Sequence, residues 1–374
     1  MEWHVWDFPD TLYIKLSEDF RKELCDRLVN KFGSRNKASI FLGINTTTLK
    51  RGLQTGIDSE GFEAYTSMKL IKKILDIFPE DKEAIERNVI AYRARSGNSI
   101  TNPILPLRET PEMYSIIAHM ICDGSAGERK SPVYYNSCRE LLEEFKNYLT
   151  TFGEMRTNEY LVHSKVLPVY GILFPKAITD ILSHVFQIKF VRTEHLPKKV
   201  FSTTEECKYA FIRALFDDEG TFSSKQRQLV FIQKEYGIVR DIKKLFDSIE
   251  IRTGYISKVD RDIGILHSIT VLSQSRVKFK TVINFTHPEK RRILEYVVKN
   301  DMERKNYVTL KTKIIQMFEQ QNSLSRLEIT NRLKSNINSV TEILYEFRKE
   351  GIIESNFNGK NKPYIWSKAK VCVS

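Results

Sequence analysis

Two nine-residue stretches decide the fold: IIAHMICDG from Ile116 to Gly124 and IRALFDDEG from Ile212 to Gly220. Each is a mainly apolar run with alanine at its third position, and each ends in an acidic residue followed by glycine. We expect two helices that end where the glycine takes a left-handed backbone conformation, so that the acid lies at the helix tip. The small residues Ala118 and Ala214 predict that the two helices approach each other closely.

The acids at the two tips, Asp123 and Glu219, become neighbours if the helices pack side by side. Two adjacent carboxylates repel each other unless a cation lies between them. Oxygen ligands of this kind favour Mg²⁺, or another divalent ion such as Mn²⁺, which can support hydrolysis of a phosphodiester. A single acid-glycine helix end is an ordinary surface cap, but two copies of it favour a paired site.

The segment from Thr110 to Lys305 alternates β-branched or aromatic runs with amphipathic stretches. Strands are predicted at 229–233, 255–259 and 265–272, and helices at 141–152 and 238–249. This alternation predicts a fold of the α+β class.

Three stretches together resemble the LAGLIDADG homing endonuclease family in its single-chain, two-motif form: LFDDEG at Leu215–Gly220, FIQK at Phe231–Lys234 and NFTHPEKR at Asn284–Arg291. The resemblance implies a pseudo-twofold pair of αββαββα repeats, at 110–205 and 206–305, with saddle-shaped antiparallel sheets that lie along double-stranded DNA. A monomer then acts as a pseudo-dimer. The chain does not have the terminal residues of an intein, so we expect a free-standing protein.

The resemblance also implies roles for individual residues. The metal-binding catalytic acids are Asp123 and Glu219, with the backbone carbonyls of Cys122 and Asp218 as further ligands, and with Gln233 and Lys234 to order the attacking water and stabilise phosphate charge. The first repeat has Asn136-Ser137 where the second has Gln233-Lys234. Only one half keeps the basic accessory residue, which indicates asymmetric, slow or absent cutting.

Both ends of the chain resemble DNA-reading modules. Short helices between Ser17 and Gly56, with turns at Gly33 and Gly43, predict a helix-turn-helix inside an N-terminal helical domain at 1–98, with a plain helical hairpin as the alternative. A Ser, Gly, Asn and Pro cluster at 96–106 marks the domain boundary. From 309 to 370, three helices and a basic hairpin have the order of a winged helix. Nucleic-acid contacts are expected at Thr47, Lys50, Arg51, Asn136, Lys225, Lys258, Asn338, Lys360 and Lys362.

The composition is consistent with a polyanionic partner. The chain of 374 residues has a formal net charge of +12, and cations that neutralise phosphates release condensed counterions. A merely soluble basic enzyme has the same charge. No apolar run is long enough to span a bilayer and no secretory signal is evident, so a cytoplasmic protein without a membrane partner is expected. The five cysteines contain no CxxC pair, which disfavours zinc sites and a disulfide framework.

Three functions remain open. The first is a sequence-specific, divalent-metal-dependent DNA endonuclease of LAGLIDADG type. The second is a transcription regulator that uses the same fold to bind DNA without cutting it. The third is an RNA-processing endonuclease, for which Tyr134, Tyr135, Tyr160 and Tyr170 are candidates to stack on unpaired bases. His119 is expected on the outer side of the first motif helix, without a ligand role.

Overall fold

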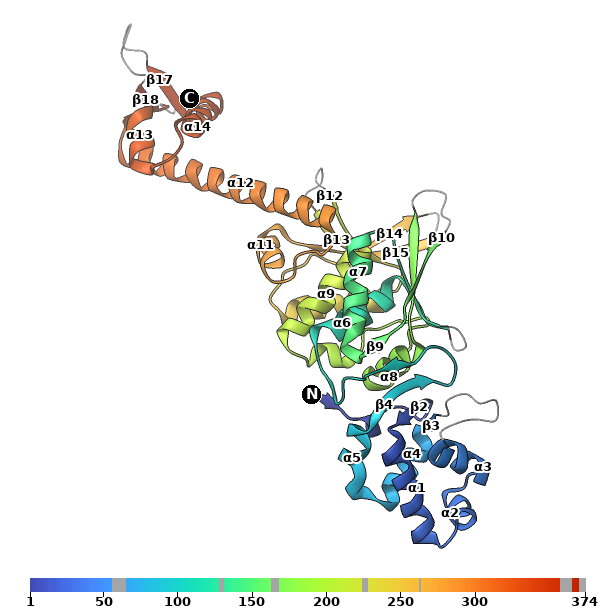
Figure 1. Cartoon of the computed structure of the whole chain (residues 1–374). Helices are drawn as coiled ribbons and strands as arrows, with labels where there is room; N and C mark the ends of the chain where they lie inside the picture. The colour runs from blue at the N-terminus through green and yellow to red at the C-terminus, as the bar shows by residue number, and fades with distance from the viewer. Residues whose placement is uncertain are drawn as a thin grey trace. The chain divides into compact units, whose positions relative to one another are not determined.

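The computed structural model describes residues 1–55, 65–127, 131–162, 168–223, 228–261, 264–356 and 365–369. The chain separates into two compact units, Met1–Leu294 and Glu295–Ser374. Figure 1 colours the chain from blue at the N-terminus to red at the C-terminus. The larger unit holds both motif helices.

The N-terminal segment of the larger unit mixes helices and strands. Its elements are β1 Glu2–Trp3, η1 Val5–Asp7, β2 Leu12–Leu16, α1 Glu18–Phe32, α2 Arg35–Leu42, α3 Thr46–Leu49, the π-helical turn η2 Lys50–Thr55, β3 Thr66–Ser67, α4 Met68–Ile77, η3 Pro79–Asp81, α5 Lys82–Arg87, β4 Val89–Ala94, β5 Ile100–Thr101 and β6 Leu107–Arg108. The short helices α1, α2 and α3 begin at Ser17, Ser34 and Asn45, and Gly33 and Gly43 end the first two in the left-handed conformation.

The expectation that this segment is wholly helical was wrong. Strand β2 alternates buried and half-buried residues, a period of two that the LYIKL sequence at Leu12–Leu16 already carries. Strand β4 lies near the end of the domain predicted to be helical at 1–98, because its Val, Ile and Tyr side chains suit a sheet. These strands form a five-stranded sheet in the order β3-β2-β4-β5-β9. The last strand of this sheet, β9, belongs to the first repeat predicted at 110–205, and thus lies on the far side of the domain boundary predicted at 98–110.

The two motif-containing halves share one order of elements. The first half contains α6 Pro111–Cys122, β7 Gly124–Ser125, β8 Val133–Asn136, α7 Arg139–Leu149, η4 Thr150–Phe152, β9 Glu154–Met155, β10 Asn158–Val162, β11 Val169–Leu173 and α8 Lys176–Phe186. The second half, preceded by η5 Lys198–Phe201, contains α9 Glu205–Glu219, β12 Gly220–Ser223, β13 Gln228–Gln233, α10 Tyr236–Ser248, β14 Ser257–Arg261, β15 Gly264–Val271 and α11 Ser273–Val282.

Each half has its own four-stranded antiparallel sheet. The orders are β7-β8-β11-β10 and β12-β13-β15-β14. In both sheets the first strand pairs with the second, the second with the fourth, and the fourth with the third. The predicted repetition of αββαββα is therefore confirmed by topology, with the short β9 as an addition that joins the N-terminal sheet.

The motif glycines do not have the predicted conformation. Gly220 is extended, with φ −72° and ψ 140°, and Gly124 has no positive φ either. Their role is steric, because each chain turns from helix directly into strand. An added Cβ would lie 2.4 Å from the Phe216 carbonyl oxygen at Gly220, and 2.5 Å from the Met120 Cα at Gly124. Only glycine fits where the new strand crosses the last helical turn.

The two motif helices lie side by side in the centre of the larger unit (Figure 1). Ala118 and Ala214 are both buried, and the Ser115 hydroxyl on α6 donates a hydrogen bond to the Ala210 carbonyl on α9 at 3.4 Å. Small side chains let the two backbones come this close. Arg213 does not obstruct the packing, since its Nε donates to the Ile283 carbonyl at 2.6 Å.

The smaller unit has its own core. Helix α12 spans Pro288–Gln320 and therefore begins in the larger unit; it is followed by β16 Ser323–Ser325, α13 Arg326–Leu333, α14 Ile337–Lys349, β17 Ile353–Asn356 and β18 Ile365–Lys368. The sheet order is β16-β18-β17, and its buried residues include Phe318, Ile343, Phe347 and Trp366. The prediction was three helices followed by a two-stranded hairpin, whereas strand β16 lies between α12 and α13 and makes the sheet three-stranded. The winged-helix assignment and the four-domain division stay predictions.

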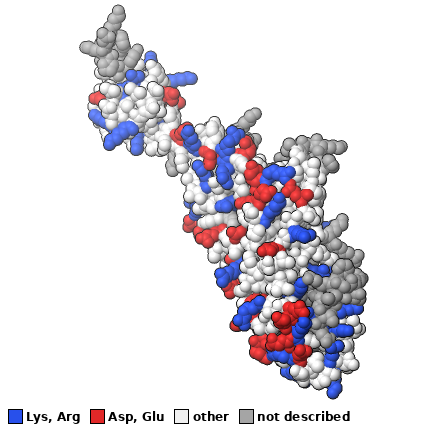
Figure 2. All heavy atoms as spheres, viewed as in Figure 1, with Lys and Arg blue, Asp and Glu red and all other residues white. Residues whose placement is uncertain are grey.

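Helix α12 runs through 305–309, the interval between the second predicted repeat and the predicted C-terminal module. Residues 295–309 contain neither glycine nor proline, and a polar segment without a helix breaker continues a helix readily. None of the described helices combines the length and apolar character that a membrane span requires. On the face drawn in Figure 2, Lys and Arg side chains are interspersed with Asp and Glu.

Candidate active site at the ends of two helices

Three successive acids end helix α9, and each has a different environment. Asp217 is buried and accepts hydrogen bonds from the backbone N–H groups of Thr286 and His287, at 3.1 and 2.9 Å. Burial raises the pKa of Asp217 to about 6, although these backbone donors oppose the rise. Asp217 thus anchors the segment that follows α11, whose Thr286 hydroxyl also donates to Glu144 on α7.

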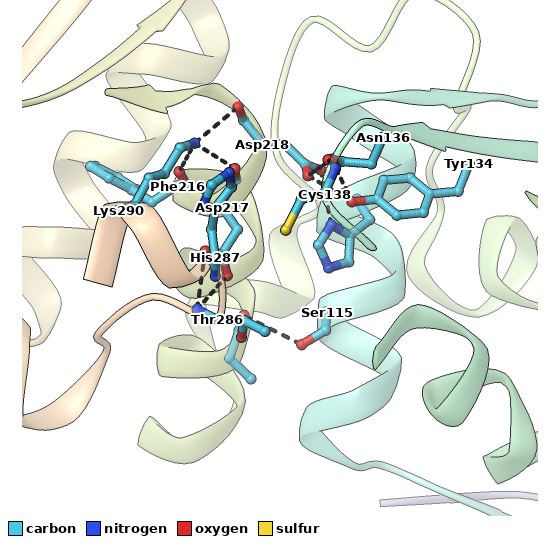
Figure 3. A network of polar contacts seen from close by, with 12 residues as sticks. Ser115, Tyr134, Asn136, Cys138, Phe216, Asp217, Asp218, Thr286, His287 and Lys290 are labelled. Atoms are coloured by element: carbon cyan, nitrogen blue, oxygen red, sulfur yellow. Dashed lines mark hydrogen bonds and ion pairs between the residues drawn. The ribbon is translucent and has the colours of Figure 1, made fainter. Parts of the chain in front are cut away.

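Asp218 belongs to the second half, but its side chain forms hydrogen bonds with residues of the first half. Its carboxylate, fully buried, lies 2.9 Å from Nδ1 of His119 and accepts a hydrogen bond from the Tyr134 hydroxyl at 2.8 Å. The Asn136 amide donates to the same carboxylate at 3.1 Å and to the Tyr134 hydroxyl at 3.0 Å (Figure 3). Burial lowers the pKa of His119, but the adjacent Asp218 carboxylate outweighs it and the net shift is upward.

The expectation for His119 was therefore wrong. Its side chain is 1% exposed and faces the other helix instead of lying on the outer side of α6. The physical reason is the partner: a buried imidazole needs a hydrogen bond, and Asp218 supplies an acceptor across the helix interface.

Glu219 and Asp123 are the acids at the two helix tips. Both are half-buried. Burial, together with the negative charges of Asp218 and Glu219, raises the pKa of Asp123 to about 7. Burial and Asp218 also raise the pKa of Glu219, while a 3.3 Å hydrogen bond from the Gln233 amide opposes that rise. Within the described part of the chain, no donor reaches the Asp123 carboxylate.

Lys290 places a positive charge at the end of α9. From the first turn of α12, its ammonium donates to the backbone carbonyls of Phe216 at 3.0 Å, of Asp217, and of Asp218 at 3.4 Å (Figure 3). The Phe216 carbonyl also accepts the Gly220 backbone N–H. The Asp217 and Asp218 carbonyls lie beyond the last intrahelical bond, so the ammonium satisfies the helix end there. Burial lowers the pKa of Lys290, and Asp217, Asp218 and Asp123 oppose the fall.

A divalent ion fits part of this site. The carboxylates of Asp123 and Glu219 offer hard oxygen ligands. The pKa of Asp123 is raised by burial first and then by the negative charges of Asp218 and Glu219, which a cation would neutralise. The Asp218 carbonyl, predicted as a further ligand, accepts a hydrogen bond from Lys290 at 3.4 Å, and its role as a ligand stays a prediction. Among the described residues, no group of three or more His, Cys, Asp or Glu side chains has the arrangement of a metal site.

The other residues predicted for the site lie at different places. Gln233 contacts Glu219, Lys234 is exposed, and Cys122 carries a thiol whose pKa burial raises. The side chain of Asn136 is occupied by Asp218, Tyr134 and the Cys138 N–H, so it is directed into the protein. Thr47, Lys50, Lys258 and Asn338 are exposed and Arg51 is half-buried. Lys225, Lys360 and Lys362 lie outside the described residues.

Sequence reasoning missed His119, Tyr134 and Lys290. A histidine inside an apolar run is one available signal, because burial of an imidazole demands a partner. Lys290 was within the segment quoted for the family resemblance, but its contact with the end of α9 appears only in three dimensions. Tyr134, proposed to stack on bases, is instead fully buried against His119 and Phe145.

No protein-family model matches the sequence. A stretch of 251 residues is 24% identical to glutamine–fructose-6-phosphate aminotransferase (isomerizing) of Methanocaldococcus jannaschii, and covers 63% of this chain and 21% of that protein. The chain thus spans about a fifth of the length of the curated relative that it matches.

Several solved structures are similar to the chain. One is I-DmoI in complex with DNA and Mn, with 12% identity, a TM-score of 0.36, and coverage of 46% of this chain and 96% of that chain. The homing endonuclease I-WcaI, bound to its DNA recognition sequence, has 12% identity, a TM-score of 0.36, and coverage of 49% and 85%. Full-length DUF199/WhiA from Thermatoga maritima has 13% identity, a TM-score of 0.34, and coverage of 66% and 93%. At such values the fold assignment rests on the strand order of this chain itself.

Proposed function

We propose that the chain is a divalent-metal-dependent endonuclease of LAGLIDADG type that hydrolyses double-stranded DNA at specific sequences. The observation that carries the proposal is the position of Asp123 and Glu219 at the ends of two packed helices, where burial and the charges of Asp218 and Glu219 together raise the pKa of Asp123 to about 7. Paired carboxylates of this kind are costly unless a cation neutralises them. A chain that only binds DNA gains nothing from an anionic pair that faces phosphates.

The proposed roles follow from the contacts at the site. Asp123 and Glu219 would hold Mg²⁺ or Mn²⁺, which supplies positive charge for the hydrolysis of a phosphodiester. Gln233 holds Glu219 in place through its amide, and Lys234 lies next to it, exposed, to meet a phosphate. Lys290 stabilises the end of α9 and adds a fixed cation near the acids.

DNA is the proposed partner, and the two antiparallel sheets are its proposed platform. The formal net charge of +12 favours a polyanion. The candidate contacts remain Thr47, Lys50, Arg51, Asn136, Lys225, Lys258, Asn338, Lys360 and Lys362, with the flanking segments proposed to lengthen the DNA footprint. Of these, Asn136 has the weakest support, because its amide is engaged with Asp218.

A second candidate is a DNA-binding regulator without cleavage. Two observations favour it: Lys290 occupies the Asp218 carbonyl proposed as a metal ligand, and Asn136 supports Asp218 instead of Asp123. A built-in ammonium could then replace the metal as the cation of the site. The two candidates share the fold and the partner, and they differ in whether phosphodiester bonds break.

The decisive experiment is a cleavage selection with the full chain. A circular DNA library with a randomised segment is incubated with the protein and Mg²⁺, and all new DNA ends are sequenced. The same library is used in a binding selection with Ca²⁺. The proposal expects ends at one shared sequence, lost in Asp123→Asn and in Glu219→Gln, while both variants keep the binding preference.

Asp247→Asn is the matched control, because it removes an exposed carboxylate from α10 outside the site. It should cut as the unchanged protein does. A shared bound sequence without new ends, in Mg²⁺ and in Mn²⁺ alike, would reject the endonuclease and support the regulator.

A further inference from the structure

A cleft of about 750 Å³ lies on the larger unit, away from the paired acids. The segment that joins the two halves forms one wall, and helix α10 forms the other. Five cationic side chains line the cleft: Lys189, Arg192, Lys198, Arg240 and Lys244. We call this feature the basic cleft.

Buried Asp241 on α10 holds the two walls together. Its carboxylate lies 2.9 Å from Nδ1 of His195 and accepts a hydrogen bond from the Leu196 N–H at 3.3 Å. Gly237, one turn earlier, lets the joining segment lie against the helix, because an added Cβ would be 2.3 Å from the Glu194 carbonyl oxygen. The cleft is therefore preformed, and half-exposed His195 is a polar residue on its lining.

The charges of the basic cleft are not balanced within it. Asp241 is already engaged by His195, the Leu196 N–H, Lys244 at 3.4 Å and Arg240 at 3.7 Å. Glu194 is the other acid on the lining. Lys189, Arg192 and Lys198 are exposed and form no ion pair with the described residues. Arg192 also has a φ of 55°, a conformation that costs energy in a non-glycine residue and recurs at binding sites.

The floor of the basic cleft is apolar. Phe186, Ile188 and Leu196 line it and are buried, with 3%, 6% and 4% exposure. An apolar floor beneath a cationic rim suits an amphipathic anion. The volume of about 750 Å³ lies inside the range of roughly 300–1,000 Å³ that is common for small-molecule sites.

The position of the cleft separates it from the proposed DNA platform. Helix α10 packs its buried residues, such as Ile242 and Leu245, against strands β13 and β15. Arg240 and Lys244 lie on the exposed side of the same helix. The cleft is thus on the helical side of the second sheet, and a duplex on the open side of the sheet would not reach it.

We propose that the basic cleft binds a small organic phosphate, with the phosphate groups on the cationic rim and an apolar or aromatic moiety on the floor. Arginine and lysine form short, charge-assisted hydrogen bonds with phosphate oxygens. The proposal is independent of the nuclease site, because it uses none of the paired acids.

ATP is the first probe, measured by titration calorimetry with the full chain at physiological ionic strength. One ATP should bind per chain, and more tightly than inorganic pyrophosphate, which lacks a group for the floor. Arg192→Gln and Arg240→Gln should each weaken ATP binding by about tenfold, the value of one charge-assisted hydrogen bond. Arg292→Gln, an exposed arginine of α12 outside the cleft, is the control and should bind as the unchanged protein does.

The outcomes separate the possible sources of phosphate. Retention of ATP binding by Asp123→Asn, which disables the proposed nuclease, would confirm that the two sites are distinct. Displacement of ATP by a short DNA duplex would instead assign the cleft to a nucleic-acid backbone and overturn the proposal. The proposal would also be overturned if Arg292→Gln weakened ATP binding as much as Arg192→Gln and Arg240→Gln do. Equal affinity for pyrophosphate and ATP, or no binding of either one, would overturn it as well.

Discussion

The two halves of the larger unit have the same order of elements and different polar chemistry. In the second half, Gln233 at the end of β13 donates to Glu219, the acid of its own motif. In the first half, Asn136 at the end of β8 donates to Asp218, an acid of the other motif. Asp123 is left without a donor among the residues described. Identical scaffolds therefore place their acids in unequal environments, and the pKa of Asp123 shows the consequence.

The motif helices show the same asymmetry where they meet. When the two motifs are aligned, His119 of the first corresponds to Leu215 of the second, and Cys122 corresponds to Asp218. His119 and Asp218 form a polar pair across the helix interface. The residues at the aligned positions, Leu215 and Cys122, form the counterpart pair. The comparison teaches that one buried polar contact is enough to distinguish the two halves, and the four predictions below test it.

The largest effect is expected from Asp218→Leu. The substitution leaves His119, Tyr134 and Asn136 without their shared acceptor, and the loss of one partner from such a buried network costs about 3–5 kcal/mol of unfolding free energy. Urea unfolding followed by circular dichroism measures it. Cys122→Ala, the counterpart, should cost clearly less. The double variant His119→Leu with Asp218→Cys copies the second pair, and it should regain part of the loss; equal costs for Asp218 and Cys122 would contradict the asymmetry.

The next effect is that of Lys290→Met. The carbonyls at the end of α9 lose their donor and the acids lose a nearby cation, which we expect to cost about 2–3 kcal/mol. The pKa of Asp123 should rise further, measurable by carboxyl NMR titration. Lys278→Met, which removes an exposed lysine paired with Glu250, should change neither quantity by much. An unchanged Asp123 titration in Lys290→Met would show that the ammonium does not act on the first half.

A gain in stability is expected from Asp123→Asn. The pKa of Asp123 is 3.8 in an unperturbed chain and about 7 in the fold, so the folded protein binds a proton more tightly between these values. Stability of the unchanged protein therefore falls as pH rises from 4 to 7, and the asparagine variant avoids this fall. Without divalent ions, the variant should be more stable by about 2 kcal/mol at pH 8 and similar at pH 4. The same difference at both pH values would show that ionisation is not the cause.

The smallest effect is expected from Gln233→Ala. Loss of its single bond to Glu219 should cost no more than about 1 kcal/mol, and the pKa of Glu219 should rise because a donor to the carboxylate is gone. Carboxyl NMR titration measures the pKa. Asn136→Ala should leave Glu219 nearly unchanged, since it supports Asp218. Equal pKa shifts in the two variants would mean that the halves respond alike.

The acid-glycine helix end that occurs twice predicted two packed helices, and the αββαββα order around them was implied by the resemblance to the LAGLIDADG family. The close packing of the motif helices also followed from Ala118 and Ala214. The conformation of Gly220 could not be predicted from the sequence. A left-handed helix cap and a lack of space for a Cβ atom both require glycine, so the residue type does not distinguish them. The contacts of Lys290 and Asp218 depend on residues distant in sequence, and no local periodicity reports them.

The pairing of β5 with β9 has a consequence for the exchange of modules between related chains. Residues Ile100 and Thr101 pair with Met155 and Glu154, so the first half contributes the edge strand of the N-terminal sheet. A recombination joint placed between 98 and 110 would separate that edge from the rest of its sheet. Chimaeras that transplant the N-terminal segment should therefore carry a compatible β9 with it, or lose the orientation that the shared sheet imposes.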